Sequence, residues 1–188
     1  DANGLSPRHV KLAKKGEGKG ELNPYTIGQT FAEHMPTDAI VIDEGATSGG
    51  GCYASSVTSE PHDWITLTGG SIGFGLPTAI GAAVACPDRK VIAIHGDGGA
   101  MYTIQSLWTM AREDLDICVV IFANRKYQIL QVELARVGAQ SMNKKTLDML
   151  DIGSPNLDFV QLSEGMGVSA TRATTIEEFN SQYRQAMK

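Results

Sequence analysis

The chain has 188 residues, of which 42% are hydrophobic and 20% are charged, and its formal net charge is -5. This length suits one domain with a substantial core. The negative charge excludes a basic field that would attract nucleic acid or an anionic membrane. No apolar run reaches the ~20 residues needed to span a bilayer. The three cysteines, Cys52, Cys86 and Cys118, form no C-x-x-C pair, so they indicate neither zinc nor an iron–sulfur cluster. Cys86 and Cys118 lie in apolar runs and are interpreted as buried thiols in a reducing cytoplasm.

The first residues differ in composition from the rest of the chain. Residues 1–22 are polar and rich in Lys and Gly, which is typical of a linker or tail, so we expect the domain to span 23–188. At this boundary Asn23 can cap a helix that carries Pro24 at its first position. The composition of the tail favours a domain that was cut from a longer protein.

Apolar runs alternate with helical patterns along the remainder of the chain. After the first helix, the expected elements are a strand over 39–42, a strand over 64–68, a helix over 76–85, a strand over 90–95, a helix through 104–110, a strand over 116–123, a helix over 127–137, a loop over 138–155, a short helix over 159–166, an edge strand over 168–171 and a last helix that begins with a capping box at 175–178.

Strands that are continuous apolar runs and alternate with helices predict a mainly parallel sheet that helices cover on both faces. The expected fold class is therefore α/β, with three α/β/α layers and a doubly wound sheet. Ligands of such sheets lie at the carboxyl ends of the strands. Four of the predicted strands end at Asp43-Glu44-Gly45, Gly69-Gly70, Gly96-Asp97-Gly98-Gly99 and Asn124.

The turn Gly96-Asp97-Gly98-Gly99 joins a strand directly to a helix. The free N–H groups of Gly98, Gly99 and Ala100 at such a helix start can bind an anion. Asp97 would repel a bare phosphate, and a divalent cation between them removes this conflict. Mg²⁺ prefers oxygen ligands and commonly bridges a carboxylate to phosphates, and Asn124 offers an amide oxygen as a second ligand. A backbone carbonyl of the following turn would be a third ligand.

Two other interpretations of these residues remain open. Gly-Asp-Gly is a common turn in which Asp97 simply caps a helix, and Asn124 alone is more often a turn residue. A dinucleotide site would need the spacing G-x-G-x-x-G, but Met101 stands where the third small residue belongs, and the glycines of 69–75 do not fit this spacing either. His95, just before the turn, is interpreted as a buried histidine with satisfied hydrogen bonds.

Taken together, these motifs resemble the cofactor-diphosphate domain of thiamine-diphosphate enzymes, in the group of acetolactate synthase and benzoylformate decarboxylase. The family motif is Gly-Asp-Gly followed by Asn-Asn, and Asn124 stands 27 positions after Asp97, where the family has its second Asn. Ala123 replaces the first Asn, which is not a metal ligand. The resemblance implies Mg²⁺ on Asp97, Asn124 and the backbone carbonyl of Lys126. It extends over about 23–188.

The resemblance also implies where the rest of thiamine diphosphate binds. The segment 69–83 resembles the part of the family that lies under the cofactor, where Ile72 would wedge it into its bent form and the backbone of Gly70 and Ile72 would hold its aminopyrimidine. The expected cofactor contacts are Ala46, Thr47, Gly70, Ile72, Gly96, Asp97, Gly98, Gly99, Asn124, Lys126 and Tyr127, with Gln128 and Leu130 in the substrate pocket.

The function implied is that of a C-terminal domain of a 2-oxo acid decarboxylase or acetolactate-synthase-like enzyme, which anchors the cofactor for chemistry at its C2 carbanion. The family's activating glutamate lies in a pyrimidine-binding domain of the partner subunit, absent here together with the middle domain. No catalytic residue is therefore assigned, and the isolated domain is expected to be inactive. The complete protein should be a homodimer or homotetramer. Two alternatives are a small subunit of a split, sulfopyruvate-type decarboxylase and a non-catalytic cofactor-binding module.

Overall fold

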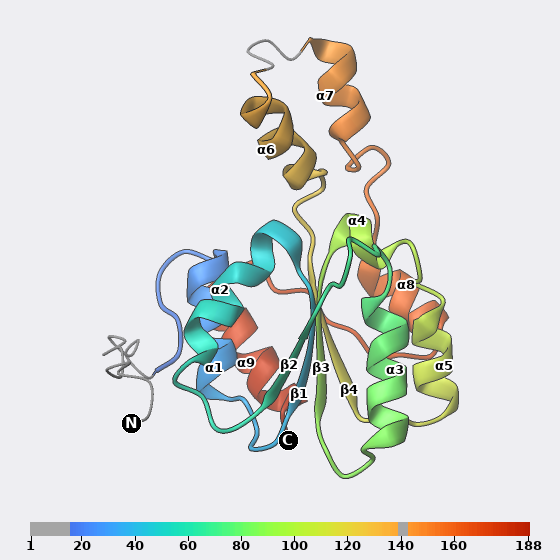
Figure 1. Ribbon diagram of the computed structural model, residues 1–188. Coiled ribbons are helices and arrows are strands. Elements are labelled where there is room, and N and C mark those ends of the chain that lie inside the picture. The colour runs from blue at the N-terminus through green and yellow to red at the C-terminus, as the bar shows by residue number, and fades with distance from the viewer. Residues whose placement is uncertain (1–15, 139–142) are drawn as a thin grey trace, which may run out of the picture.

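The structure is a computed structural model that describes residues 16–138 and 143–188, and Figure 1 shows a sheet between two layers of helices. The described strands form one four-stranded sheet in the order β2-β1-β3-β4, and each neighbouring pair is parallel. The predicted three-layer α/β/α fold with a doubly wound parallel sheet is confirmed. The strands are β1 (Ile40–Glu44), β2 (Asp63–Thr66), β3 (Val91–Gly96) and β4 (Ile117–Phe122).

Helices cover both faces of this sheet (Figure 1). Side chains of α1, α2 and α9 share one buried cluster with the sheet, and side chains of α3, α4 and α5 share another, against which α8 packs. None of the described helices is long and apolar enough to cross a membrane. The helices are α1 (Pro24–Glu33), α2 (Ala46–Ser56), α3 (Gly75–Ala85), α4 (Asp97–Ala100), α5 (Ser106–Arg112), α6 (Gln128–Arg136), α7 (Lys144–Leu150), α8 (Phe159–Gly165) and α9 (Ile176–Ala186).

The central strand β3 explains why the strands are continuous apolar runs. Ile92 and Ile94 belong to the cluster on the α1 face, while Val91 and Ala93 belong to the cluster on the α3 face. All four side chains are fully buried. Since a strand points successive side chains to opposite faces, both faces of β3 have to be apolar.

Helix α2 was not among the predicted elements. Its sequence, ATSGGGCYASS, contains three glycines, which are poor helix formers. Packing overrides this preference, because α2 lies directly against α1. A Cβ atom on Gly51 would meet the carbonyl oxygen of Pro24, and one on Gly28 would meet the carbonyl oxygen of Gly51. The glycines therefore let two helix backbones approach closely.

The loop predicted over 138–155 is wrong in part, because Lys144–Leu150 is helix α7. Its N-cap is Asn143, whose side chain accepts a hydrogen bond from the backbone N–H of Thr146 at 2.9 Å. This cap satisfies one of the free N–H groups of the first turn. Residues 139–142 lie outside the described residues. Figure 1 shows α6 and α7 projecting together from the carboxyl edge of the sheet.

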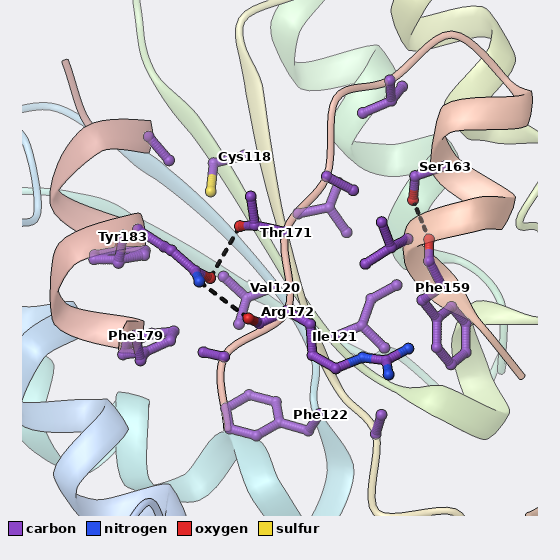
Figure 2. Close-up of a pocket in the computed structure, with 18 of the residues that line it drawn as sticks. Cys118, Val120, Ile121, Phe122, Phe159, Ser163, Thr171, Arg172, Phe179 and Tyr183 are labelled. Carbon is purple, nitrogen blue, oxygen red and sulfur yellow. Dashed lines mark hydrogen bonds between the residues drawn. The ribbon is translucent and has the colours of Figure 1, made fainter. Parts of the chain in front are cut away.

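The edge strand predicted over 168–171 is also wrong, since these residues form no strand. The segment is instead attached to α9, where Gln182 accepts a hydrogen bond from the hydroxyl of Thr171 and donates one to the carbonyl of Arg172. Thr171 and Arg172 of this segment line the same pocket as Val120 and Phe122 of β4 (Figure 2). The pocket has a volume of about 980 Å³, and both segments line it.

Of the three cysteines, Cys86 and Cys118 were expected to be buried thiols. Cys52 is fully buried, and burial raises the pKa of its thiol to about 12. Cys86 and Cys118 are only partly buried. All three are free thiols in the described structure.

Part of the expected linker or tail packs against the domain. The backbone N–H of Gly18 donates to the hydroxyl of Thr30 on α1 at 2.9 Å, and its carbonyl accepts from the side-chain amide of Asn180 on α9 at 3.0 Å. The hydroxyl of Thr30 donates in turn to the amide oxygen of Asn180. This buried network joins α1, α9 and the segment before α1. Residues 1–15 lie outside the described residues.

Replacing Asn180 with Ala should lower the free energy of unfolding by about 1–3 kcal/mol, because it leaves the Gly18 carbonyl buried without a partner and removes the oxygen to which the Thr30 hydroxyl donates. Urea denaturation of the chain measures this change. Asn156→Ala is the control, since Asn156 is exposed, and it should change the stability by less than about 0.5 kcal/mol. Equal effects of the two substitutions would show that the network does not stabilise the fold.

Candidate functional site

The strand order reverses between β1 and β3, which are neighbours in the sheet although β2 lies between them in the chain. The register of this pair sets Glu44 beside His95. The chain leaves β1 toward α2 on one face and leaves β3 toward α4 and α5 on the other. Because these connections diverge, the carboxyl ends of β1 and β3 are the place where open parallel sheets bind ligands.

The carboxylate of Asp97 joins the two loops that the sequence assigns to a metal. Asp97 is only 4% exposed. Its Oδ1 accepts a hydrogen bond from the N–H of Gly98 at 2.9 Å, and its Oδ2 accepts one from the N–H of Arg125 at 2.6 Å. Arg125 follows Asn124 directly. The Gly-Asp-Gly turn after β3 and the asparagine loop after β4 are therefore held against each other.

The asparagine loop is also held from its other side. Arg125 has a positive φ of 62°, which a non-glycine residue seldom adopts. Its carbonyl accepts from the N–H of Ile152 at 3.0 Å, and the carbonyl of Leu150 accepts from the N–H of Tyr127 at 2.9 Å. The segment that follows α7 therefore fixes the conformation of the loop.

Asp97, Asn124 and Lys126 provide a carboxylate, an amide oxygen and a backbone carbonyl, which are oxygen donors of the kind that Mg²⁺ prefers. The Asn124 Oδ1 accepts from the Lys126 N–H at 3.1 Å, and the Lys126 carbonyl accepts from the Gln128 N–H at 2.9 Å. A carboxylate has about four lone-pair sites and a carbonyl oxygen has two, so each donor keeps room for a metal. The described part of the chain contains no group of three His, Cys, Asp or Glu residues that could hold a metal. The proposed ligand set is of another kind, because Asp97 is its only residue of these four types.

The start of α2, which follows β1, offers further backbone donors at the same edge of the sheet. Its N-cap is Gly45, which has no side chain that could cap the first turn. Ala46 has a positive φ of 47°, and both Ala46 and Thr47 are exposed. The first N–H groups of a helix have no partner within the helix and can bind an anion. These two expected diphosphate contacts therefore lie on a surface that can serve this purpose.

The turn 69–75 carries the residues expected to contact the aminopyrimidine. Gly69, Gly70 and Gly73 all have positive φ, which glycine adopts without strain. The N–H of Ile72 donates to the carbonyl of Gly70 at 2.9 Å. The side chain of Ile72 is 54% exposed, which is high for a large aliphatic group. The turn thus presents an apolar side chain outward from a tightly folded backbone.

Glu44 is a residue of the site to which the sequence gave no role beyond its position. Its side chain is buried, and it accepts hydrogen bonds from the backbone N–H groups of Gly73 and Gly75. The available signal was a carboxylate at the last position of an apolar strand. Such a side chain needs partners at the strand end, but the sequence does not say which backbone provides them.

His95 is fully buried, as expected, but the expectation that its hydrogen bonds are satisfied is wrong. Neither ring nitrogen has a hydrogen-bond partner among the described residues. Its Nδ1 lies 3.7 Å from the Oε2 of Glu44, which is too long for a hydrogen bond. Burial lowers the pKa of His95 to about 4. The ring is therefore neutral at pH 7 and forms no ion pair with Glu44.

The remaining predicted residues lie on or beside α6. The ring of Tyr127 packs on Gly98, where a Cβ atom would be 2.5 Å from its Cε1. Gln128 and Leu130 lie on α6, and Leu130 is 46% exposed. Neither residue lines the pocket of Figure 2, which runs along β4 and reaches Asn124 only at one end. The structure brings Tyr127 to the strand-end site and leaves Gln128 and Leu130 on the projecting pair α6–α7.

Comparison with known proteins identifies relatives of the chain. The family described as "Thiamine pyrophosphate enzyme, C-terminal TPP binding domain" matches residues 49–188. A Mycobacterium tuberculosis protein provisionally named acetolactate synthase large subunit IlvX is 49% identical over 168 residues, which are 89% of this chain and 33% of that protein. The benzoylformate decarboxylase of Pseudomonas aeruginosa is 34% identical over 181 residues, covering 96% of this chain and 32% of the relative.

A solved structure has the same fold. The thiamine diphosphate-dependent 4-hydroxybenzoylformate decarboxylase of Rhodococcus jostii RHA1 superposes with a TM-score of 0.81 at 29% identity, over 96% of this chain and 33% of that chain. The chain thus spans about a third of the length of these relatives.

The substitution Gly75→Ala should lower the free energy of unfolding by about 1–3 kcal/mol through overpacking. The added Cβ would lie 2.5 Å from the ring of His95 and 2.9 Å from the carboxyl group of Glu44. Gly81→Ala, in the same helix, meets no atom within 4 Å, and it should stabilise the chain by about 0.5–1 kcal/mol. Urea midpoints of the two variants measure both changes. A Gly75→Ala variant as stable as the unchanged chain would contradict the close packing at the strand ends.

Proposed function

Because this chain belongs to the family of C-terminal thiamine pyrophosphate-binding domains of thiamine pyrophosphate enzymes, we propose that it holds the cofactor's diphosphate through a Mg²⁺ ion at the carboxyl ends of β3 and β4. Thiamine pyrophosphate and thiamine diphosphate are the same cofactor. Asp97, Asn124 and the carbonyl of Lys126 would bind the metal.

The hydrogen bond from the N–H of Arg125 to the Oδ2 of Asp97, 2.6 Å long, is the observation that carries this proposal. It brings a buried carboxylate and an exposed asparagine, 27 positions apart in sequence, to one edge of the sheet. A helix cap would need Asp97 alone and gives no reason for this contact. A metal site needs both loops, and their oxygen donors fit Mg²⁺.

Other residues of the chain would bind and orient the rest of the cofactor. The exposed first turn of α2, with Ala46 and Thr47, would donate N–H groups to the diphosphate together with Gly98 and Gly99. The backbone of Gly70 and Ile72 would hold the aminopyrimidine. The exposed side chain of Ile72 would support the bent form of the cofactor. When bound, the cofactor supplies an electron sink for carbanion chemistry.

We further propose that the chain works as part of a larger enzyme that acts on 2-oxo acids, either as a decarboxylase or as an acetolactate-synthase-like carboligase. It spans about a third of its relatives, which leaves room in them for other domains. A pyrimidine-binding domain of a partner subunit in a homodimer or homotetramer would supply the activating glutamate. Gln128 and Leu130 on α6 would face the substrate. The proposed setting is the cytoplasm.

The substitution Asn124→Ala should weaken the binding of thiamine diphosphate in the presence of Mg²⁺ by at least about ten-fold, because it removes one metal ligand. Isothermal titration calorimetry with and without Mg²⁺ measures this loss. Ala123→Asn is the matched control, since Ala123 is the exposed neighbour of Asn124, and its affinity should stay within about two-fold of the unchanged chain.

The same titration of Asp97→Ala tests the second side-chain ligand and should give a loss at least as large. The unchanged chain should lose most of its affinity when Mg²⁺ is removed. Binding that is independent of the metal, or equal affinities for Asn124→Ala and Ala123→Asn, would contradict the ligand assignment.

The isolated chain should bind the cofactor without turning over pyruvate or benzoylformate, because no described residue is assigned the role of the activating glutamate. An assay for released CO₂ at saturating cofactor and Mg²⁺ checks this expectation. Turnover that scales with the concentration of the purified chain, and that Asn124→Ala abolishes, would refute it.

A further inference from the structure

The carboxyl group of Glu44 makes contacts that the proposed metal site does not explain. Glu44 is the last residue of β1 and is 5% exposed. Its Oε1 accepts a hydrogen bond from the N–H of Gly73 at 2.5 Å, and its Oε2 accepts one from the N–H of Gly75 at 2.7 Å. Hydrogen bonds to a charged, buried acceptor are among the stronger ones in proteins. Both oxygens thus hold the end of the turn 69–75.

The second of these bonds also caps a helix. Gly75 is the first residue of α3, and Phe74 before it offers no side-chain cap. Glu44 therefore takes the place of a local cap, although it lies 31 residues earlier in the chain. A negative group at this end of the helix is favoured by the helix dipole. The turn is fixed at the point where it becomes a helix.

The segment after α4 holds the same turn from another side. The hydroxyl of Thr103 donates to the carbonyl of Gly73 at 2.8 Å. The side chain of Tyr102 packs against Gly73, where an added Cβ atom would lie 2.7 Å from the Cβ of Tyr102. Both backbone polar groups of Gly73 are therefore bonded to side chains from other parts of the chain.

The carboxyl group of Glu44 also lies close to Gly99 of α4. A Cβ atom on Gly99 would lie 3.2 Å from the Oε1 of Glu44, so only a glycine leaves this contact unstrained. The ring of His95 fills the space beside Gly75 and does not hydrogen-bond to Glu44. The carboxyl group thus lies between the turn 69–75 and the helix α4.

We propose that Glu44 is a positioning residue that fixes the turn 69–75 relative to α4, so that the two ends of one cofactor molecule meet their contacts together. This inference rests on the proposed function, in which α4 and the loop of Asn124 hold the diphosphate while the turn holds the aminopyrimidine. In this proposal Glu44 itself contacts neither end of the cofactor. It sets the separation of the two loops that do.

A glutamine at position 44 separates this role from simple packing. Its amide has the shape of the carboxyl group but offers one acceptor and one donor, and the donor would face an N–H group. One of the two N–H groups would then lose its partner, and the turn would be free to move. The Gly-Asp-Gly turn keeps its own bonds, since Asp97 binds Gly98 and Arg125.

The test compares two ligands by isothermal titration calorimetry in the presence of Mg²⁺: thiamine diphosphate, which spans both loops, and inorganic diphosphate, which needs only the metal side. Glu44→Gln should lower the affinity for thiamine diphosphate by about ten- to a hundred-fold. It should lower the affinity for inorganic diphosphate by less than about three-fold. Glu60→Gln removes a carboxylate at an exposed position and should change neither affinity.

Thr103→Val is the second variant, because it frees the same turn without touching the buried carboxyl group. It should lower the affinity for thiamine diphosphate by roughly three- to ten-fold and leave the affinity for inorganic diphosphate unchanged. It decides the question if Glu44→Gln does not fold, as judged by thermal unfolding. Equal losses for both ligands, or no loss for either, would overturn the positioning role alone. Failure of the unchanged chain to bind either ligand with Mg²⁺ would overturn the proposed function and this inference with it.

Discussion

Parallel pairing between β1 and β3, with Glu44 beside His95, determines where every loop of the site lies. The two strands are neighbours in the sheet, but the chain leaves them toward opposite faces. Burial holds the pairing in place, since the side chains of Val41, Ile42, Ile92 and Ile94 are fully buried. A shift of one residue between parallel strands would turn these side chains to the wrong faces. The position of the loops at the carboxyl ends of β1 and β3 therefore follows from the core.

Two buried carboxylates attach the loops of the site to the sheet by hydrogen bonds. Asp97 accepts N–H groups from its own turn and from the loop after β4. Glu44 accepts two N–H groups from the turn before α3. In each case the acceptor stands at or just after the end of a central strand, and the donors lie in a loop or in the first turn of a helix. Because a buried carboxylate without partners is costly, these bonds fix the loops before any ligand arrives.

The sequence predicts the fold well because parallel strands buried on both faces are continuous apolar runs, as β3 illustrates. It also brings Asp97 and Asn124 together, since their strands are adjacent in a simple alternation of strand and helix. The same local rules fail for α2, whose glycines argue against a helix until the close approach of α1 explains them. They fail for 168–171, where a β-like pattern forms no strand and the chain bonds to Gln182 of α9. The contacts of Glu44 escape prediction because its partners lie 29 and 31 residues away and are backbone groups, which carry no sequence signal.

The most direct test of the metal site is a crystal structure of the chain grown with thiamine diphosphate and Mn²⁺, a substitute for Mg²⁺ that can be located by its anomalous scattering. The proposed function predicts one anomalous peak about 2.0–2.3 Å from a carboxylate oxygen of Asp97, the amide oxygen of Asn124 and the carbonyl oxygen of Lys126, with diphosphate oxygens completing the coordination. A peak elsewhere, or a diphosphate bound directly to the N–H groups of α4 with no metal beside Asp97, would contradict it.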